Sequence, residues 1–179
     1  MKIRVLALDF DNTIAFTDRL ANDVAKVLQD ARNSGVLRVL VTGRILSDLQ
    51  PLLSSPELFD AIVAENGAVL QLPHDPHPIA LSLGPNAALV AELSRRAIAH
   101  RCGICIVEAA AAASHDVLTI VQTLGLPQGI SFNRDRLMLL PHGVTKAEGL
   151  REAVWRLGAS LHNALAIGDA ENDQPLLDA

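Results

Sequence analysis

The sequence has few aromatic residues and no basic runs. Its 179 residues include four phenylalanines, one tryptophan and no tyrosine, and lysine and arginine are scattered. Proteins that bind nucleic acids need basic surfaces and, for single strands, aromatic side chains on which bases stack. The formal net charge of −5 and the pI near 5.6 disfavour such a partner further. We therefore expect no nucleic-acid partner.

Long hydrophobic runs and cysteines are also scarce. Every apolar run is shorter than the ~18 residues that a membrane-spanning helix needs. The first run, residues 3–8, contains an arginine and ends before Asp9, so it is too short for a secretory signal. Two cysteines, Cys102 and Cys105, are too few for a disulfide scaffold. These features predict a cytoplasmic protein with no membrane partner.

The composition is that of a folded domain. Half of the residues are hydrophobic and a fifth are charged, so the chain can bury enough apolar surface to exclude extended disorder. A length near 180 residues predicts one domain with room for an insertion. A chain of this length buries roughly 70% of its unfolded surface, so folding requires neither a disulfide nor a metal.

Strand and helix patterns alternate along much of the chain. Short apolar runs typical of buried strands occur at residues 3–8, 36–41, 61–64, 67–72 and 163–167. Apolar residues at helical spacing occur at 20–31, 45–53 and 150–157. This order favours an α/β fold with a doubly wound, Rossmann-like parallel sheet.

The pattern changes after residue 72. Three prolines in residues 73–78 prevent a helix or a central strand from continuing. The elements that we expect beyond it are a helix at 89–97, a strand at 104–107, a helix at 117–124, and strands at 129–132 and 137–140, with the alanine run 109–113 starting a helix. We predict an inserted α+β cap at residues 74–142, built of two βαβ-like halves. Residues 1–73 and 143–179 would form the core.

Polar residues follow three of the predicted core strands. They occupy residues 9–13, 42–44 and 168–169. Because a ligand site in an open α/β sheet lies beyond the carboxyl ends of the strands, we expect these residues to converge. Lys146, which opens the helix before the last strand, and Asp173 would join them.

The predicted cluster contains carboxylates, a hydroxyl and an ammonium group. The carboxylates are those of Asp9, Asp11, Asp169 and Asp173. Like charges a few ångström apart raise each other's pKa, so the cluster would be costly without a cation. Mg²⁺ takes carboxylates, waters and phosphate oxygens as ligands. The set of groups suits phosphoryl transfer through an aspartyl-phosphate.

These motifs resemble those of the haloacid dehalogenase superfamily, in its phosphatase branch with a type IIB, or Cof-like, cap. Four motifs match in order, at residues 9–13, 41–44, 145–150 and 168–173, and residues 65–68 (Glu-Asn-Gly-Ala) resemble a further segment of this branch. The resemblance covers nearly the whole chain. It implies an Mg²⁺-dependent phosphatase that acts on a small phosphorylated metabolite, either a sugar phosphate or a phosphoglycolate-type acid.

The resemblance also implies a role for each motif residue. Asp9 would attack phosphorus and become the aspartyl-phosphate, and Asp11 would act as general acid and then general base. The implied Mg²⁺ ligands are Asp9, Asp11 through its backbone carbonyl, Asp169 and Asp173. The implied phosphate- and substrate-binding residues are Thr42, Gly43, Arg44, Asn66, Lys146 and Asn172. Thr42 and Lys146 would hold the phosphoryl oxygens.

Two features depart from the family pattern. The family often has glycine directly after the motif lysine, whereas Ala147 and Glu148 precede Gly149 here. The chain also ends at Ala179, inside the helix expected after Asp173. We therefore expect the last core elements of the family to be absent from this chain.

Alternatives remain at several positions. The short motifs also occur as polar turns and helix caps. Cys102 and Cys105 lack a second ligand pair, so we expect buried thiols and no metal site. Residues 134–136 face either the substrate or solvent.

Two other functions share the same residue types. A phospho-accepting receiver module also uses an aspartate, a threonine, a lysine and an acidic pair, but its phosphorylated aspartate follows the third strand. A non-catalytic regulatory domain of a larger protein would keep the motifs without the activity. The oligomeric state stays open between monomer and dimer.

Overall fold

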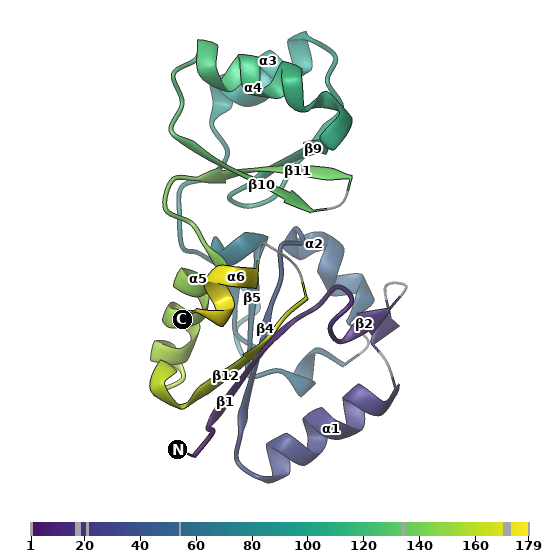
Figure 1. The fold of residues 1–179 in the computed structure, drawn as a ribbon, viewed down its shortest axis with the longest axis vertical. Coiled ribbons are helices and arrows are strands. Elements are labelled where there is room, and N and C mark those ends of the chain that lie inside the picture. The colour runs from purple at the N-terminus through teal and green to yellow at the C-terminus, as the bar shows by residue number, and fades with distance from the viewer. Residues whose placement is uncertain are drawn as a thin grey trace.

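The computed structural model describes residues 2–16, 19–20, 22–53, 55–133, 135–169 and 173–178. The chain forms two sheets, one of six strands and one of four, placed one above the other (Figure 1). A two-stranded ribbon of β2 (Ala15–Phe16) and β3 (Arg19–Leu20) lies beside the larger sheet.

The larger sheet has the strand order β12-β1-β4-β5-β6-β7. Its strands are β1 (Val5–Asp9), β4 (Leu37–Val41), β5 (Ala61–Ala64), β6 (Val69–Gln71), β7 (Ile79–Ala80) and β12 (Ala164–Ile167). The first four in spatial order are parallel, and β6 and β7 are antiparallel. The reversal follows from the short turn η3 (Glu65–Gly67), because only antiparallel neighbours can be joined by so few residues.

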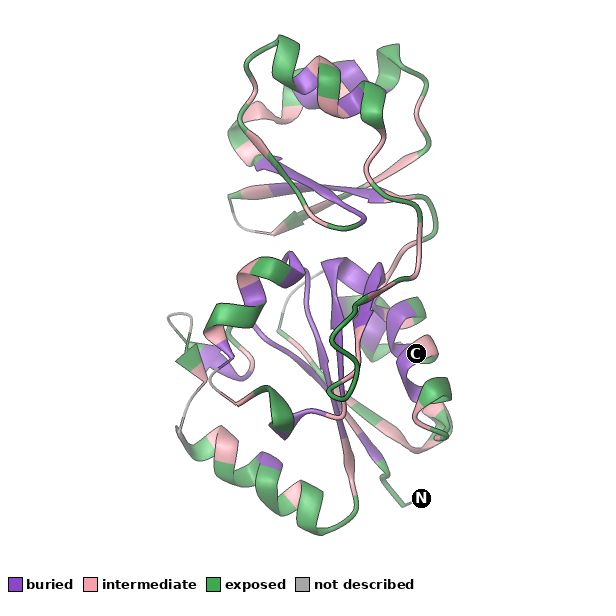
Figure 2. Ribbon diagram, turned by 180° about the vertical axis from the view of Figure 1, so that it is seen from behind, coloured by how far each residue is buried: buried purple, intermediate pink, exposed green. Residues whose placement is uncertain are grey.

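Alternate side chains of the parallel strands pack against helices on opposite faces. Leu8, Leu40 and Ile62 pack with α1 (Asn22–Asn33) and α2 (Leu46–Leu49). Their neighbours in the strands pack with α5 (Lys146–Arg156) and α6 (Gln174–Leu177). Figure 2 shows the buried strands between these two layers. The doubly wound α/β fold predicted from the sequence is therefore confirmed. Short 3-10 turns complete the core: η1 (Gln50–Leu52), η2 (Pro56–Leu58) and η5 (Leu161–Asn163).

The smaller sheet is antiparallel and has the order β10-β11-β9-β8. Its strands are β8 (His100–Cys102), β9 (Val107–Ala110), β10 (Gln128–Asn133) and β11 (Arg136–Pro141). The helices α3 (Ala87–Arg95) and α4 (Ser114–Thr123), the latter preceded by η4 (Ala111–Ala113), cover the face that points away from the larger sheet (Figure 1).

Three predictions for this part of the chain differ from the structure. Each half consists of a helix followed by two antiparallel strands, not of a βαβ unit. The expected strand at 104–107 begins only at Val107, and its polar partner β8 was missed because His100–Cys102 has no apolar run. Of the alanine run 109–113, the first two residues end β9 and the others form η4.

The chain leaves the larger sheet later than predicted. Strand β7 pairs with β6, and the Leu81 N–H still donates to the Ala68 carbonyl at 2.8 Å. The sheet thus reaches eight residues beyond the boundary expected at residue 73, because the proline-rich loop returns to the sheet edge. His74 and His77 in that loop are exposed.

The two cysteines differ in environment. Cys105 is buried, as predicted, but Cys102 is exposed. Desolvation raises the pKa of the Cys105 thiol, and the partial desolvation of Cys102 raises its pKa as well. Among the described residues, no helix is long and apolar enough to cross a membrane.

Gly67 and Gly149 let the start of α5 lie directly against the η3 turn. A Cβ atom on Gly149 would be 2.5 Å from the Gly67 Cα and 2.5 Å from Val63 Cγ1. A Cβ atom on Gly67 would be 2.0 Å from the carbonyl oxygen of Thr145. The glycine that follows Lys146 by three residues therefore brings this helix close to the sheet.

We expect Gly149→Ala to destabilise the protein. In an ordinary helix interior alanine is favoured over glycine by about 1 kcal/mol, but here the added methyl group overpacks a backbone contact, at a typical cost of 1–3 kcal/mol. Urea unfolding measures the difference. Ala147→Gly, two residues earlier in the same helix, reports the ordinary preference for alanine. A Gly149→Ala protein more stable than the parent would contradict the close approach.

Candidate active site

The buried ammonium group of Lys146 joins two carboxylates at the carboxyl end of the larger sheet. Lys146 Nζ lies 2.6 Å from Asp9 Oδ1 and 2.5 Å from Asp173 Oδ1. Asp9 ends β1, Lys146 begins α5, and Asp173 directly precedes α6. The side chain of Thr145 caps α5 by accepting a bond from the Glu148 N–H, which fixes where the helix starts. Ala147 and Glu148, which stand where the family often has glycine directly after the lysine, do not move the Lys146 ammonium group away from the two carboxylates.

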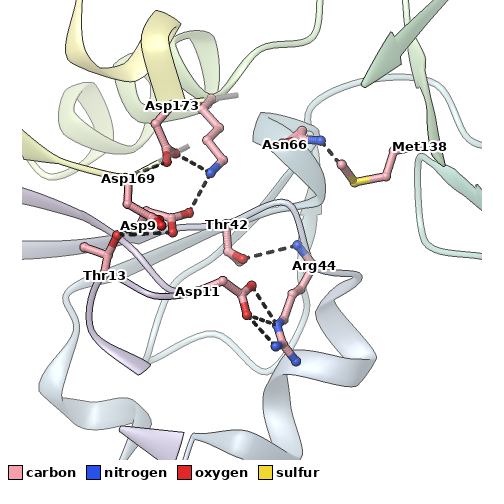
Figure 3. A network of polar contacts seen from close by, with 10 residues as sticks. Asp9, Asp11, Thr13, Thr42, Arg44, Asn66, Met138, Asp169 and Asp173 are labelled. Atoms are coloured by element: carbon pink, nitrogen blue, oxygen red, sulfur yellow. Dashed lines mark hydrogen bonds and ion pairs between the residues drawn. The ribbon is translucent and has the colours of Figure 1, made fainter. Parts of the chain in front are cut away.

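Asp169 lies at the open side of this cluster. Carboxylate oxygens of Asp9, Asp169 and Asp173 all lie within 4.8 Å of one another. The Thr13 hydroxyl donates to Asp169 Oδ1 at 3.3 Å and is 3.5 Å from Asp9 Oδ2, and the Asp169 N–H donates to Asp173 Oδ2 at 3.1 Å (Figure 3). Three converging carboxylates with one ammonium group suit a hard divalent cation.

Burial raises the pKa of Asp9 to about 6. Desolvation is the main cause, and the charges of Asp173 and Asp11 add to it. Lys146 acts in the opposite direction through its charge and its hydrogen bond. A cation bound among these carboxylates would favour the ionised form of Asp9 that a nucleophile needs.

Asp11 lies on the other side of the site and points away from the three carboxylates. Its carboxylate accepts bonds from Arg44 Nε at 2.9 and 3.2 Å and from Arg44 Nη2 at 2.5 Å (Figure 3). The Arg44 guanidinium lies 5.3 Å from the centre of the Phe10 ring. The Asp11 side chain is thus separate from the carboxylate cluster, which leaves only its backbone carbonyl as the implied metal ligand.

Thr42 and its neighbours follow β4. Thr42 is buried, and its hydroxyl accepts a bond from the Arg44 N–H at 3.2 Å. A Cβ atom on Gly43 would be 3.1 Å from Asn66 Oδ1. The Asn66 amide donates to Met138 Sδ at 3.3 Å, so it faces the smaller sheet. Asn172 lies outside the described residues.

A cavity of about 170 Å³ separates Asp11 and Arg44 from the smaller sheet. The residues that line it from that sheet and its hairpin are Glu108, Asn133, Asp135, Arg136 and Met138. Arg136 Nη1 lies 3.3 Å from the buried Glu108 carboxylate. Asp135 and Arg136 line the cavity, and Asp135 is also exposed to solvent, so both positions expected for this hairpin stay open. Arg134 lies outside the described residues.

Sequence analysis missed three of these cavity residues. Glu108, Asn133 and Met138 lie on strands whose pairing places them on one face, with Met138 opposite both Glu108 and Ser131. The alternation of polar residues in an otherwise apolar strand was the available signal for Glu108. No motif marked Asn133 or Met138.

The raised pKa of Asp9 predicts a pH-dependent stability of the metal-free protein. The folded state favours protonated Asp9, so its contribution to stability is greatest below pH 4 and is lost as the pH rises to about 6. The loss is on the order of 3 kcal/mol. Chemical unfolding at several pH values in a chelator measures it.

Asp9→Asn should remove this component of the pH profile. Asp30→Asn, an exposed position on α1, should keep the profile of the parent protein. Parallel profiles for the Asp9→Asn and parent proteins between pH 4 and 7 would show that the Asp9 pKa is not raised.

The position of Asp9 bears on the receiver alternative. Asp9 lies at the end of the first strand of the chain, whereas the phosphorylated aspartate of a receiver follows the third strand. A receiver module also contains no unit that corresponds to the smaller sheet. The geometry therefore disfavours that interpretation.

Comparisons with known proteins identify the family of this chain. A family model described as haloacid dehalogenase-like hydrolase matches residues 6–120 and 118–179. The phosphoglycolate phosphatase of Aeropyrum pernix is 29% identical over 189 residues, which cover 98% of this chain and 77% of that protein. The phosphoglycolate phosphatase of Methanothermobacter thermautotrophicus is 26% identical over 194 residues, covering 99% of this chain and 82% of that protein.

A solved structure shares the fold. It is a subclass IIB sugar phosphatase of the same superfamily, with a TM-score of 0.73 and 17% identity over 95% of this chain and 82% of that one. The resemblance inferred from the motifs is thereby confirmed, and the chain belongs to the family of haloacid dehalogenase-like hydrolases.

Proposed function

We propose that this chain, a phosphatase of the haloacid dehalogenase-like family, hydrolyses a small phosphomonoester through an aspartyl-phosphate on Asp9. The observation that carries the proposal is the buried contact of Lys146 with Asp9 and Asp173 beside Asp169. Family membership and the phosphatase names of the relatives support the same reaction.

Asp9 would act as the nucleophile. One of its oxygens attacks phosphorus, the bond to the leaving oxygen breaks, and the phosphoryl group is carried on Asp9 until water releases it as inorganic phosphate. Lys146 and the Thr42 hydroxyl would hold phosphoryl oxygens. The buried position of Lys146 strengthens its electrostatic effect because water is excluded there.

Asp11 would move the protons. It would donate a proton to the leaving oxygen and then accept one from the attacking water. In the structure its carboxylate is held by Arg44, so the proposed role requires Asp11 to turn from this partner towards the leaving group.

The metal that fits this donor set is Mg²⁺. Asp9, Asp169 and Asp173 would hold it, with the Asp11 carbonyl as a further ligand implied by the family. When bound it would neutralise the carboxylates and the charge that develops on the phosphoryl oxygens. Family phosphatases generally use a divalent metal.

The smaller sheet together with α3 and α4, which we call the smaller-sheet unit, would act as a cap that sets specificity. We propose that it comprises most of the predicted 74–142 insertion, without the β7 segment, on a core formed by the remaining residues. The small cavity and its polar, charged lining support a compact, polar leaving group. A sugar phosphate or a phosphoglycolate-type acid meets this description, in line with the relatives' names.

Asp9→Asn should abolish the activity. We expect a loss of at least about 1,000-fold in the hydrolysis of p-nitrophenyl phosphate with Mg²⁺, because the amide cannot replace the nucleophile. Asp30→Asn, the matched change at the exposed site on α1, should keep the parent rate. A chelator should stop the parent enzyme, and added Mg²⁺ should restore it.

Equal rates for the parent and Asp9→Asn proteins would refute the nucleophile. A complete lack of Mg²⁺-dependent hydrolysis across a panel of phosphorylated sugars and acids would favour the non-catalytic regulatory domain instead.

Asp11→Asn should have an effect that depends on the leaving group. An alkyl phosphate needs a proton on its leaving oxygen, whereas p-nitrophenolate leaves readily without one. We expect kcat/KM of the variant to fall about 100-fold or more with an alkyl phosphate. With p-nitrophenyl phosphate the fall should be about ten times smaller. Steady-state kcat/KM for the two substrates measures this, and equal losses would contradict the role of general acid.

A further inference from the structure

Glu65 is a fully buried carboxylate that has no role in the reaction proposed above. It lies in η3, beside the larger sheet. Its Oε1 accepts a bond from the Ile104 N–H at 2.9 Å, and its Oε2 accepts bonds from the N–H groups of Cys105 at 2.8 Å and Ile106 at 3.2 Å. These donors belong to the segment between β8 and β9. A core side chain therefore holds a loop of the smaller sheet.

The loop approaches Glu65 as closely as a glycine allows. A Cβ atom on Gly103 would be 2.5 Å from Glu65 Oε1. A buried carboxylate is costly unless hydrogen bonds replace its water, and the three N–H groups do so. If the loop moved away without water replacing these bonds, the carboxylate would lose its partners.

The backbone of the η3 turn is strained. Glu65 and Asn66 have φ angles of 55° and 56°, in the left-handed region that costs a non-glycine residue about 1–2 kcal/mol. Two such residues in succession persist only where surrounding contacts hold them. The hydrogen bonds of Glu65 with the loop are among the contacts that hold this strained turn.

The same turn contacts both segments that carry the proposed phosphate-binding groups. The Glu65 N–H donates to the Arg44 carbonyl at 3.0 Å, and the Asn66 N–H donates to the Thr42 carbonyl at 3.0 Å. Gly67 lies against the carbonyl of Thr145, the residue before Lys146. Three consecutive residues therefore connect the loop of the smaller sheet with Thr42 and with the start of α5.

Apolar contacts surround this connection. Cys105, Ile106 and Met138 from the smaller sheet are buried in one cluster with Phe10 and other core residues. The Cys105 sulfur lies within hydrogen-bond distance of the carbonyls of Ala68 at 3.5 Å and Ser82 at 3.4 Å, to which its single S–H can donate. Cys105 is thus buried at the contact between the two units, and its exposure reports their separation.

We propose that Glu65 is a positioning residue that couples docking of the smaller-sheet unit to the arrangement of Thr42 and Lys146. When the unit is docked, the η3 turn is held and the phosphate-binding groups are in place. When it is undocked, the site binds phosphate weakly, so the apparent affinity falls with the docked fraction. The proposal rests on the proposed function for its kinetic test and for the protection by phosphate.

Glu65→Gln tests the docking without substrate. The change keeps the size of the side chain but replaces one acceptor oxygen by an NH₂ group that faces N–H donors. We expect Ellman's reagent to modify Cys105 about tenfold faster or more in the variant, while exposed Cys102 reacts at an unchanged rate. Inorganic phosphate with Mg²⁺ should slow the modification of Cys105 in both proteins.

Two control variants separate docking from stability. Glu92→Gln removes the same charge from α3, where Glu92 pairs with Arg95 and Arg96, and should leave the Cys105 rate unchanged. Leu93→Ala removes a buried side chain from the cluster under α3 and α4. It should lower the melting temperature without a comparable rise in the Cys105 rate.

The kinetic test separates positioning from a merely structural role. We expect Glu65→Gln to raise the KM for p-nitrophenyl phosphate about tenfold and to change kcat less than threefold, because saturating substrate restores the docked state. A structural role alone would reduce the amount of active enzyme and hence kcat, with KM unchanged.

The proposal is overturned if the Cys105 rate and KM of Glu65→Gln stay within twofold of the parent values. It is also overturned if Leu93→Ala raises the Cys105 rate and KM as much as Glu65→Gln does, or if phosphate with Mg²⁺ inhibits the hydrolysis but gives Cys105 no protection. The Cys105 rate without ligand does not depend on activity. A failure of the proposed hydrolysis therefore leaves that measurement interpretable.

Discussion

The site depends on the buried ammonium group of Lys146, which two buried carboxylates share. Lys146 is 2.6 Å from Asp9 and 2.5 Å from Asp173, and all three side chains are almost fully excluded from water. Removing Lys146 would leave two buried carboxylates without their shared counter-charge, at a typical cost of about 3–5 kcal/mol. The ends of β1, α5 and α6 are therefore held together by charge as well as by packing. Burial of the cluster raises the pKa of Asp9 to about 6, and Lys146 acts against this rise.

The fold brings these groups together through the direction of its strands. Strands β12, β1 and β4 run parallel, so the segments after them leave the sheet at the same edge. Asp9, Thr42 and Asp169 lie there for that reason. The antiparallel strands β6 and β7 then return the chain, and the smaller sheet follows, placed over this edge (Figure 1). The cavity beside Asp11 is bounded by both units.

Much of this could be predicted because strand ends and polar motifs are local features of the sequence. The strands of the core, the helix that begins at Lys146 and the convergence of Asp9, Asp169 and Asp173 follow from short apolar runs and from the residues after them. Strand β8 and the αββ halves were missed because His100–Cys102 is polar and short. The Arg44–Asp11 pair and the cavity residues from β9, β10 and β11 depend on how distant segments pack, which no local pattern encodes.

The η3 turn shows why local rules fail where function is concentrated. Left-handed backbone is common for glycine and tolerated by asparagine but unusual for glutamate, which occupies it here directly before Asn66. A buried glutamate is also rare unless it has partners. Each exception is explained by a contact with another segment: the loop at 104–106, the Thr42 and Arg44 carbonyls, and the Thr145 carbonyl. The strain and the buried charge stabilise nothing by themselves. They are tolerated because contacts with three segments hold the turn, at the edge where the proposed phosphate-binding groups lie. The proposed coupling follows from this arrangement, because a change in one of these segments alters the contacts that hold the other two.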